Sequence, residues 1–286
     1  VTIAIIFLIV LALLRWINQM TRIGRVSDTV GRIEQEARSA MEARLALPFL
    51  GGAPLPAGLR DSGPGVEVSG FMVGYVAFID TALLSDLAED AGCRIDILVL
   101  PGSFVFAHTV LARITGLDSV PDSLIQAMLP AFQVDELRSF DQDPRFGLVV
   151  LTEVALRALS PAVNDPGTAI DVIGRQTRLL TFWAEAWEKA AIRAAEYPRL
   201  RLPALGYDDM FEDAFSLIGR DGAGQIDVML RLTKSLVALT RTGPDASRQA
   251  ALGQLRIAVD RASAALSAAD DHRRLAEAVG AAVQPR

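Results

Sequence analysis

The chain opens with fourteen residues that carry no charge, VTIAIIFLIVLALL. As a helix this run spans roughly 21 Å, which is less than the hydrocarbon core of a bilayer at roughly 30 Å. Because the first residue is Val1 and not Met, we interpret the chain as a fragment that begins inside a membrane helix; an alternative start codon is the competing interpretation. We therefore predict a truncated membrane helix at residues 1–20.

Basic residues follow the apolar run and do not precede it. The flanking arginines and the tryptophan among them are Arg15, Trp16, Arg22 and Arg25. A signal peptide has its positive charges before the apolar run, so this order favours an anchor. The positive-inside rule then places the following chain in the cytoplasm, and Trp16 suits the membrane interface. We predict bilayer contact through residues 1–16 and an inner-membrane location with a cytoplasmic soluble part; a buried core helix is the alternative.

Composition excludes several classes of protein. Of the 286 residues, 51% are hydrophobic, which is enough for a substantial core. The net charge of −6 argues against nucleic-acid binding, because no concentrated basic face is evident. Cys93 is the only cysteine, and His108 and His272 lie far apart, so neither a cysteine framework nor a histidine-rich metal site is available. We expect no cofactor.

Beyond the first segment, the sequence predicts an α+β protein in four parts. Residues 21–47 have apolar residues at helical spacing and read as a helical stalk. Residues 48–65 are rich in proline and glycine and form a loop. Residues 66–118 alternate in strand fashion and predict a small β-rich module, whereas residues 119–286 predict a mainly helical domain.

Elements are placed within these parts by periodicity and by caps. We expect strands within residues 66–79, 94–100 and 104–114, and helices at residues 82–91, 122–133, 144–159, 166–196, 208–220, 225–241 and 245–269. Asp143 and Asp165 each precede a proline, so each is predicted to cap a helix that begins at that proline.

One segment, residues 138–171, carries a specific charge pattern. Glu153 and Arg157 lie four residues apart on an otherwise apolar helix, and Asp171, Arg175 and Arg178 repeat this spacing on the next one. Burying one of these charges alone is costly, so each needs a partner. Because the two helices are joined by a short turn, we predict that the two polar stripes face each other in a buried ion network.

A functional interpretation of the same segment stays open beside this structural one. A small polar pocket that binds an ion or a small anion would be formed by Asp141, Asp143, Glu153, Arg157, Asn164 and Asp165. Several acids beside an arginine are also compatible with metal-assisted hydrolysis, although no pair of nucleophile and base is identifiable.

Three motifs resemble a known family. QDPRFG at residues 142–147 followed by Glu153, RALSPAVNDPGTAID at residues 157–171 and PGSFV at residues 101–105 resemble the bacterial predicted membrane proteins known as domain of unknown function 2254. The resemblance implies several N-terminal membrane helices before a cytoplasmic C-terminal region, with this chain starting in the last helix. Members often have histidines just after that helix, where this chain has Asn18 and Gln19. The family supplies no activity.

Two functions follow as hypotheses. The first is a non-enzymatic, membrane-anchored cytoplasmic module that senses, regulates or forms the soluble part of a transporter or channel, and that we expect to be a homo-oligomer. The second is a membrane-bound, metal-assisted hydrolase that uses the acidic segment at residues 141–165.

Overall fold

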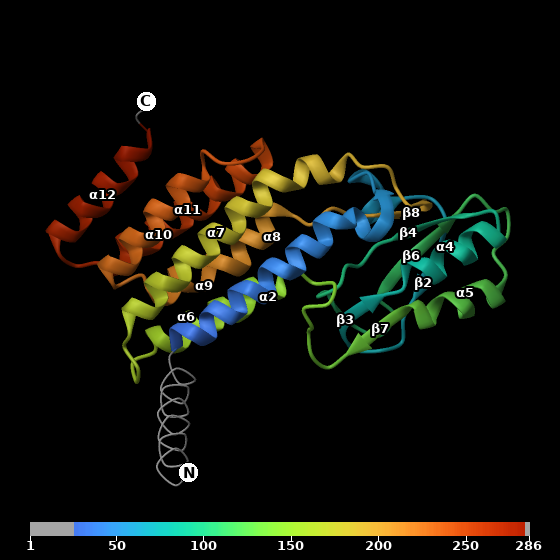
Figure 1. Ribbon diagram of the computed structural model, residues 1–286, viewed down its shortest axis with the longest axis horizontal. Coiled ribbons are helices and arrows are strands. Elements are labelled where there is room, and N and C mark those ends of the chain that lie inside the picture. Colours follow the sequence, from blue (N-terminus) through green and yellow to red (C-terminus); the bar gives the residue numbers. More distant parts are fainter. Residues whose placement is uncertain (1–25, 284–286) are drawn as a thin grey trace, which may run out of the picture.

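The protein consists of a helical lobe and a sheet lobe along one long axis (Figure 1). The structure is a computed structural model that describes residues 26–283. Helix α2 (Val26–Ala46) runs along the helical lobe and ends beside the sheet lobe. The mixed α and β architecture predicted from the sequence is therefore confirmed.

The sheet lobe contains two sheets. The larger sheet has the order β1 (Gly52–Pro54), β8 (Tyr197–Leu202), β4 (Arg94–Ile97), β6 (Val110–Thr115) and β2 (Val66–Ser69). Strand β8 is parallel to both of its neighbours, whereas β6 is antiparallel to β4 and β2. The smaller sheet is antiparallel, with the order β5 (Phe104–Val105), β3 (Gly74–Ile79) and β7 (Phe132–Asp135).

Strands from outside residues 66–118 complete both sheets. The predicted loop contributes β1, and the predicted helical part contributes β7 and β8. Strand β8 lies between β1 and β4, although α6 and α7 separate it from β4 in the sequence. A parallel pairing requires a long crossover connection, which here includes these helices. The strand expected at residues 104–114 is divided into β5 and β6 by a turn at His108, which has a φ of +69°.

The sheet lobe also contains short helices. These are η1 (Pro48–Gly51), α3 (Gly58–Ser62), α4 (Thr81–Asp90), α5 (Asp122–Met128) and η2 (Leu129–Ala131). Helix α4 begins after Asp80, whose carboxylate accepts a hydrogen bond from the Leu83 backbone amide. It contacts β4 and β8, and Ile95, Leu200 and Ile114 of the larger sheet are fully buried in the core.

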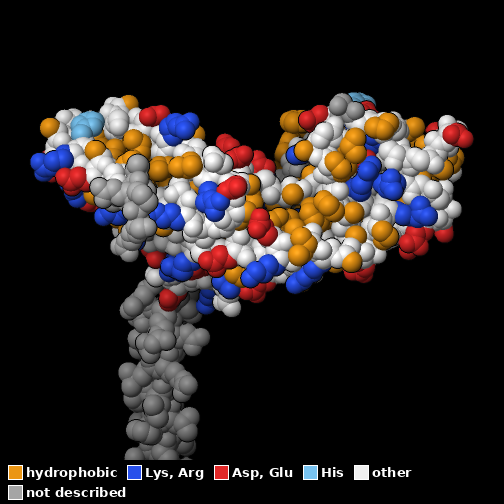
Figure 2. Space-filling view, turned by 90° about the horizontal axis from the view of Figure 1, so that it is seen from above, with side chains coloured by type: hydrophobic (Ala, Val, Ile, Leu, Met, Phe, Trp, Pro, Cys, Tyr) orange, Lys and Arg blue, Asp and Glu red, His pale blue; other side chains and the backbone are white. Residues whose placement is uncertain are grey.

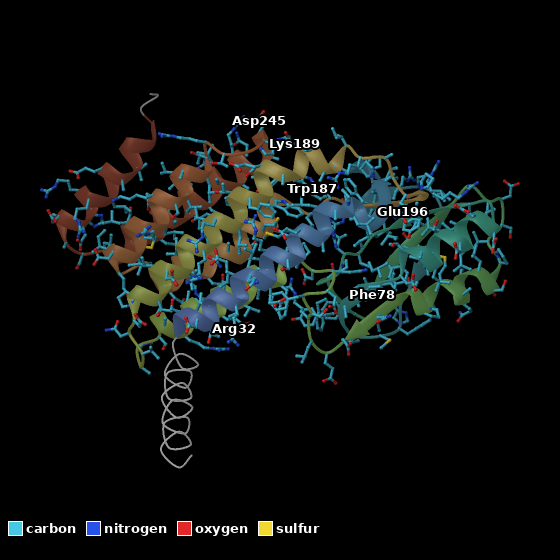
Figure 3. All side chains as sticks on the ribbon, in the orientation of Figure 1. Arg32, Phe78, Trp187, Lys189, Glu196 and Asp245 are labelled. Atoms are coloured by element: carbon cyan, nitrogen blue, oxygen red, sulfur yellow. The ribbon has the colours of Figure 1, made fainter. Side chains whose placement is uncertain are left out.

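The helical lobe is arranged around α7. Its helices are α6 (Phe146–Leu159), α7 (Pro166–Ala191), α8 (Tyr207–Phe211), the π-helical η3 (Glu212–Ser216), α9 (Leu217–Asp221), α10 (Ile226–Leu239), α11 (Asp245–Ala265) and α12 (Ala269–Val283). Helix α7 packs against α2, α6 and α10. On α7, Trp183 is fully buried and stacks on Trp187, which also meets Phe49 of η1 edge-on (Figure 3 labels Trp187).

Two predictions concern the membrane side of the chain. The predicted stalk at residues 21–47 is helical from Val26 onward, as α2. The predicted membrane helix at residues 1–20 lies outside the described residues. Within residues 26–283, none of the helices combines the length and the apolar composition needed to cross a bilayer.

Candidate functional site

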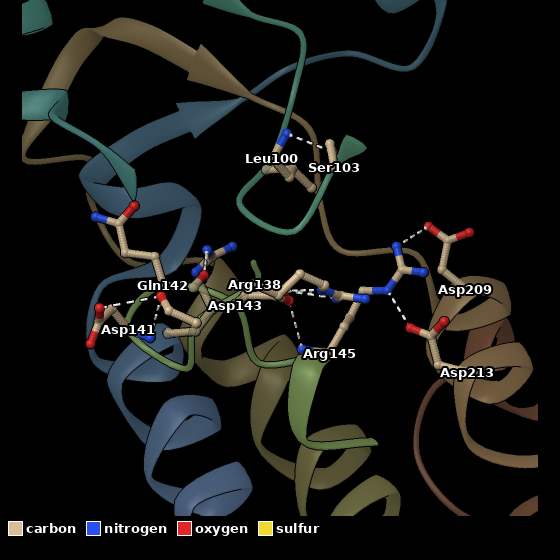
Figure 4. Close-up of polar contacts among 11 residues, drawn as sticks. Leu100, Ser103, Arg138, Asp141, Gln142, Asp143, Arg145, Asp209 and Asp213 are labelled. Carbon is tan, nitrogen blue, oxygen red and sulfur yellow. Dashed lines mark hydrogen bonds and ion pairs between the residues drawn. The ribbon is translucent and has the colours of Figure 1, made fainter. Parts of the chain in front are cut away.

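The two lobes meet at a polar junction built on the segment that precedes α6. We define the junction by Arg44, Arg138, Gln142, Asp143 and Arg145, of which Figure 4 labels the last four. The side-chain amide of Gln142 accepts a hydrogen bond from the Ile79 backbone amide at 2.9 Å and donates one to the Ile79 carbonyl at 3.3 Å. The Gln142 carbonyl accepts from Arg44 Nη2 at 2.6 Å. One residue thus connects the end of β3 with the last turn of α2.

Asp143 is the buried acid of the junction, with 1% of its surface exposed. Arg138 holds the carboxylate through Nε at 2.8 Å and Nη2 at 2.7 Å, and the Arg145 backbone amide donates to Oδ1 at 3.1 Å. Burial raises the pKa of Asp143 above its ordinary value, and the charge and hydrogen bonds of Arg138 oppose this shift only in part. Burying the charged carboxylate therefore costs free energy, and the ion pair with Arg138 offsets part of this cost.

A turn of the sheet lobe packs directly on this carboxylate. Gly102 has a φ of +88°, and a Cβ at this position would overlap the Asp143 carboxylate and approach Arg138. Glycine is needed here both for the backbone conformation and for the close approach. The PGSFV and QDPRFG motifs, which lie far apart in the sequence, therefore meet in the folded protein.

Arg145 extends the junction into the helical lobe. Its Nε donates to Asp213 at 2.7 Å and its Nη1 donates to Asp209 at 3.0 Å. Burial lowers the pKa of Arg145, but Asp213 and Asp209 outweigh it and raise that pKa above its ordinary value. The neighbouring Thr152 hydroxyl of α6 lies 2.7 Å from the Asp213 carbonyl, in the π-helical turn η3. Single π-helical turns within α-helices are often found at functional sites.

Arg44 brings α2 into the same site. Only 4% of its surface is exposed, and its Nε lacks an acceptor within the described residues. Burial lowers the pKa of Arg44 to about 10, and the negative charge of Asp143 opposes this shift only in part. The guanidinium is therefore charged at neutral pH and held by the Gln142 carbonyl.

The six residues predicted as a ligand pocket do not gather in one place. Asp141 and Asp143 lie before α6, whereas Asn164 and Asp165 lie after it, and the helix between them is about 21 Å long. Asp141 is exposed and bonds Ser139, and Asn164 is exposed at a turn with a φ of +48°. Asp165 caps α7 as predicted, and its hydrogen bonds from Thr168 lower its pKa. A ligand-binding role for these residues stays a prediction.

The predicted buried network between α6 and α7 is wrong. Glu153 and Arg157 pair with each other at 3.6 Å, but their side chains are 54% and 78% exposed. An exposed pair at this spacing needs no partner on another helix, because water solvates both charges.

The two arginines of the α7 stripe instead bind α2. Arg175 donates to Asp171 at 2.8 Å and to Glu34 at 2.7 Å, and Arg178 donates to Glu34 at 2.9 Å and 3.0 Å. Glu34 is thus the α2 residue that fixes the N-terminal half of α2 to α7. The charged stripe predicted on α7 therefore pairs with α2 and not with α6.

Most of the junction was missed by reasoning from sequence. Arg138 precedes the QDPRFG motif and Arg145 lies within it, and Asp209 and Asp213 lie four residues apart near a helix start. An acidic pair at i and i+4 is unfavourable unless a cation lies between its members. That spacing was the signal for a bridging arginine. Among the described residues, no group of three His, Cys, Asp or Glu side chains is placed to hold a metal ion.

Comparisons with known proteins agree with the motifs. The chain is 29% identical over 217 residues to an uncharacterised protein of Mycobacterium bovis and to one of Mycobacterium tuberculosis. The alignment covers 74% of this chain and 41% of each relative, so the chain spans about two fifths of the length of these curated relatives. No solved structure matches it. The family model described as predicted membrane protein, domain of unknown function 2254, matches residues 1–238, and the chain therefore belongs to this family.

Proposed function

We propose that the chain is a membrane-anchored, non-enzymatic module of the cytoplasm that relays the state of its membrane segment to the junction between the two lobes. Such a module serves sensing or regulation, or forms the soluble part of a transporter or channel. The family description of a predicted membrane protein and the uncharged first fourteen residues support the anchor.

The contacts of α2 support the relay. Glu34 fixes the N-terminal half of this helix to α7, and Arg44 in its last turn donates to the Gln142 carbonyl at the junction. A helix is stiff along its axis, so a displacement at one end reaches the other end. Helix α2 follows the apolar run in the sequence, and its last turn lies where the sheet lobe and the helical lobe meet.

Reporter fusions test the anchor and its orientation. We expect a C-terminal green fluorescent protein fusion to fluoresce in the membrane fraction of bacteria and to resist carbonate extraction. A C-terminal alkaline phosphatase fusion should be inactive, because this enzyme folds only outside the cytoplasm. Release by carbonate, or an active phosphatase fusion, would contradict the proposal.

A distance measurement between spin labels tests the relay. Labels are placed at exposed Glu89 on α4 and exposed Arg256 on α11, with buried Cys93 replaced by serine. In the full chain, Arg44→Ala should broaden the distribution of distances between the lobes, because α2 loses its contact with Gln142. The control Glu42→Ala removes an exposed ion pair on the same helix and should leave the distribution unchanged. An unchanged distribution in Arg44→Ala would remove α2 from the relay.

We also propose that the chain forms homo-oligomers through an apolar edge of the sheet lobe. This apolar edge consists of Phe71, Met72, Val73, Phe104 and Phe106, all of which are exposed. Phe104 and Phe106 lie 5.2 Å apart between ring centroids. Because the chain carries a net charge of −6, an uncharged surface avoids bringing the acidic groups of two copies together. An exposed apolar cluster of this kind provides such a surface, and burying it against a second copy removes it from water.

Light scattering of the purified full chain tests this surface. The double variant Phe71→Ser/Phe106→Ser should have a lower molecular mass than the unchanged chain. The control Ile192→Ser removes a side chain that is 85% exposed on the helical lobe and should retain the mass. Equal masses for all three proteins would exclude the apolar edge as the contact.

A further inference from the structure

A row of alternating charges crosses one face of the larger sheet. Asp96 on β4 lies opposite Arg201 on β8 and opposite Arg113 on β6, and Arg113 lies opposite Glu67 on β2. Arg201 binds Asp96 through two hydrogen bonds of 2.6 Å and 2.7 Å. Opposite charges on neighbouring strands attract, so this row is electrostatically balanced.

The adjacent row on the same face is not balanced. Arg94 precedes Asp96 by two residues and lies opposite Thr115, so it projects from the same side of the sheet. Arg199 likewise precedes Arg201 by two residues, and the parallel register of β4 with β8 places it beside Arg94. Two arginines are therefore neighbours in a row that contains no acid. Like charges in this position destabilise a sheet.

Neither arginine of this row has an acidic partner among the described residues. Arg199 Nη1 donates to the Cys93 carbonyl at 3.2 Å, which leaves its positive charge uncompensated. The Arg94 guanidinium makes no hydrogen bond or ion pair within residues 26–283, and its side chain is exposed. The positive charge of this row contrasts with the net charge of −6 of the whole chain.

A cavity opens over these side chains. It has a volume of about 400 Å³ and is lined by Arg94, Arg199 and Arg201 together with the turns at Gly92 and Gly116. Small-molecule sites commonly measure about 300–1,000 Å³. Figure 2 shows basic side chains gathered on the visible face of the sheet lobe. We name this feature the arginine cavity.

We propose that the arginine cavity binds a phosphate group. A guanidinium offers parallel N–H donors that match two oxygens of a phosphate, and a doubly charged anion offsets the repulsion between Arg94 and Arg199. Asp96 orients Arg201 through both of its carboxylate oxygens, so the third arginine is held in place before a ligand arrives. The cavity lies on the larger sheet and includes none of the junction residues, so phosphate binding here does not depend on the membrane anchor.

Titration calorimetry of the detergent-purified full chain tests the site. The probes are inorganic pyrophosphate, which represents a soluble phosphate ligand, and dihexanoyl phosphatidic acid, which represents a lipid headgroup; dihexanoyl phosphatidylcholine is the lipid control. We expect Arg94→Gln and Arg199→Gln each to weaken binding by about tenfold, because each removes a charged hydrogen-bonding group. The control Arg256→Gln alters an exposed arginine on α11 and should leave the affinity unchanged.

Thermal unfolding without a ligand gives a second readout. Arg94→Gln should raise the melting temperature, because it removes the repulsion with Arg199, whereas Arg256→Gln should not. Binding of pyrophosphate alone identifies a soluble ligand, binding of phosphatidic acid alone identifies a headgroup, and either result supports the phosphate site if the two arginine variants weaken it. The inference is overturned if neither probe binds at millimolar concentration, or if the Arg94→Gln/Arg199→Gln double variant binds as tightly as the unchanged chain.

Discussion

Replacing Asp143 with asparagine tests the junction directly, because the side chain keeps its shape and loses its charge. The substitution removes the two-point pair with Arg138, whereas the amide oxygen can still accept from the Arg145 backbone amide. The Arg138 side chain is only 14% exposed, so its charge would be left mostly buried without an acceptor. Removing one partner of a buried pair costs about 3–5 kcal/mol, and we expect about 3 kcal/mol because Arg138 keeps some contact with water.

Urea unfolding of the purified protein measures this loss. The matched control is Asp141→Asn, which alters an exposed acid two residues away and should change the free energy of unfolding by less than about 0.5 kcal/mol. The double variant Asp143→Asn/Arg138→Gln should recover part of the loss, because no unpaired charge remains. A loss below about 1 kcal/mol in Asp143→Asn would refute the reasoning that this ion pair holds the junction.

Three further substitutions test separate contacts by the same unfolding measurement. Gly102→Ala should destabilise the protein by about 2–3 kcal/mol, because the new methyl group would overlap the Asp143 carboxylate at a backbone φ of +88°. Asp165→Ala removes the cap of α7 and should cost about 1 kcal/mol at pH 7. Because the folded pKa of Asp165 is lowered, the cost should persist above its unfolded pKa of about 4 and vanish as the pH falls through the folded pKa. Glu34→Gln should cost about 1–2 kcal/mol, whereas Glu42→Gln in an exposed pair should cost less than about 0.5 kcal/mol.

Helices could be predicted from the sequence because the pattern that indicates a helix lies within the helix itself. The periodicity of apolar residues gave α6, α7, α10 and α11 with ends within a few residues, except at the C-terminal ends of α7 and α11. The Asp165 cap was predicted because its partner Thr168 lies three residues away. The similar cap at Asp143 was wrong: α6 begins at Phe146, and the Asp143 carboxylate binds the Arg138 guanidinium and the Arg145 amide before the helix starts.

Strand β8 was not predicted, although its own sequence alternates between apolar and charged residues. Its sequence, YPRLRL, places Leu200 and Leu202 in the core and Arg199 and Arg201 on the opposite face. This alternation with a period of two is a strand signal, but it follows a long helix and contains a proline. Its partner strands β4 and β1 are distant in the sequence, so the pairing that creates the arginine cavity could not be read from the strand itself.

Charge spacing alone could not assign partners. Glu153 with Arg157 and Asp171 with Arg175 have the same spacing of four residues, yet the first pair is exposed and the second joins Glu34 on α2. The spacing fixes only that the two members of a pair share a helix face. Which face is buried depends on the packing of α2. That packing depends on contacts between residues that lie more than a hundred positions apart in the sequence.

The junction joins the lobes with charged groups where apolar contacts would give more stability. Burial raises the pKa of Asp143 and lowers that of Arg44 to about 10, so both charges are held against a desolvation cost. Groups of this kind tolerate few alternative positions, because each must keep its own acceptor or donor. A shift of α2 that separated Arg44 from the Gln142 carbonyl would leave a buried charge without its hydrogen bond. The rest of the junction would then have to rearrange, so the position of α2 and the arrangement of the two lobes are energetically linked.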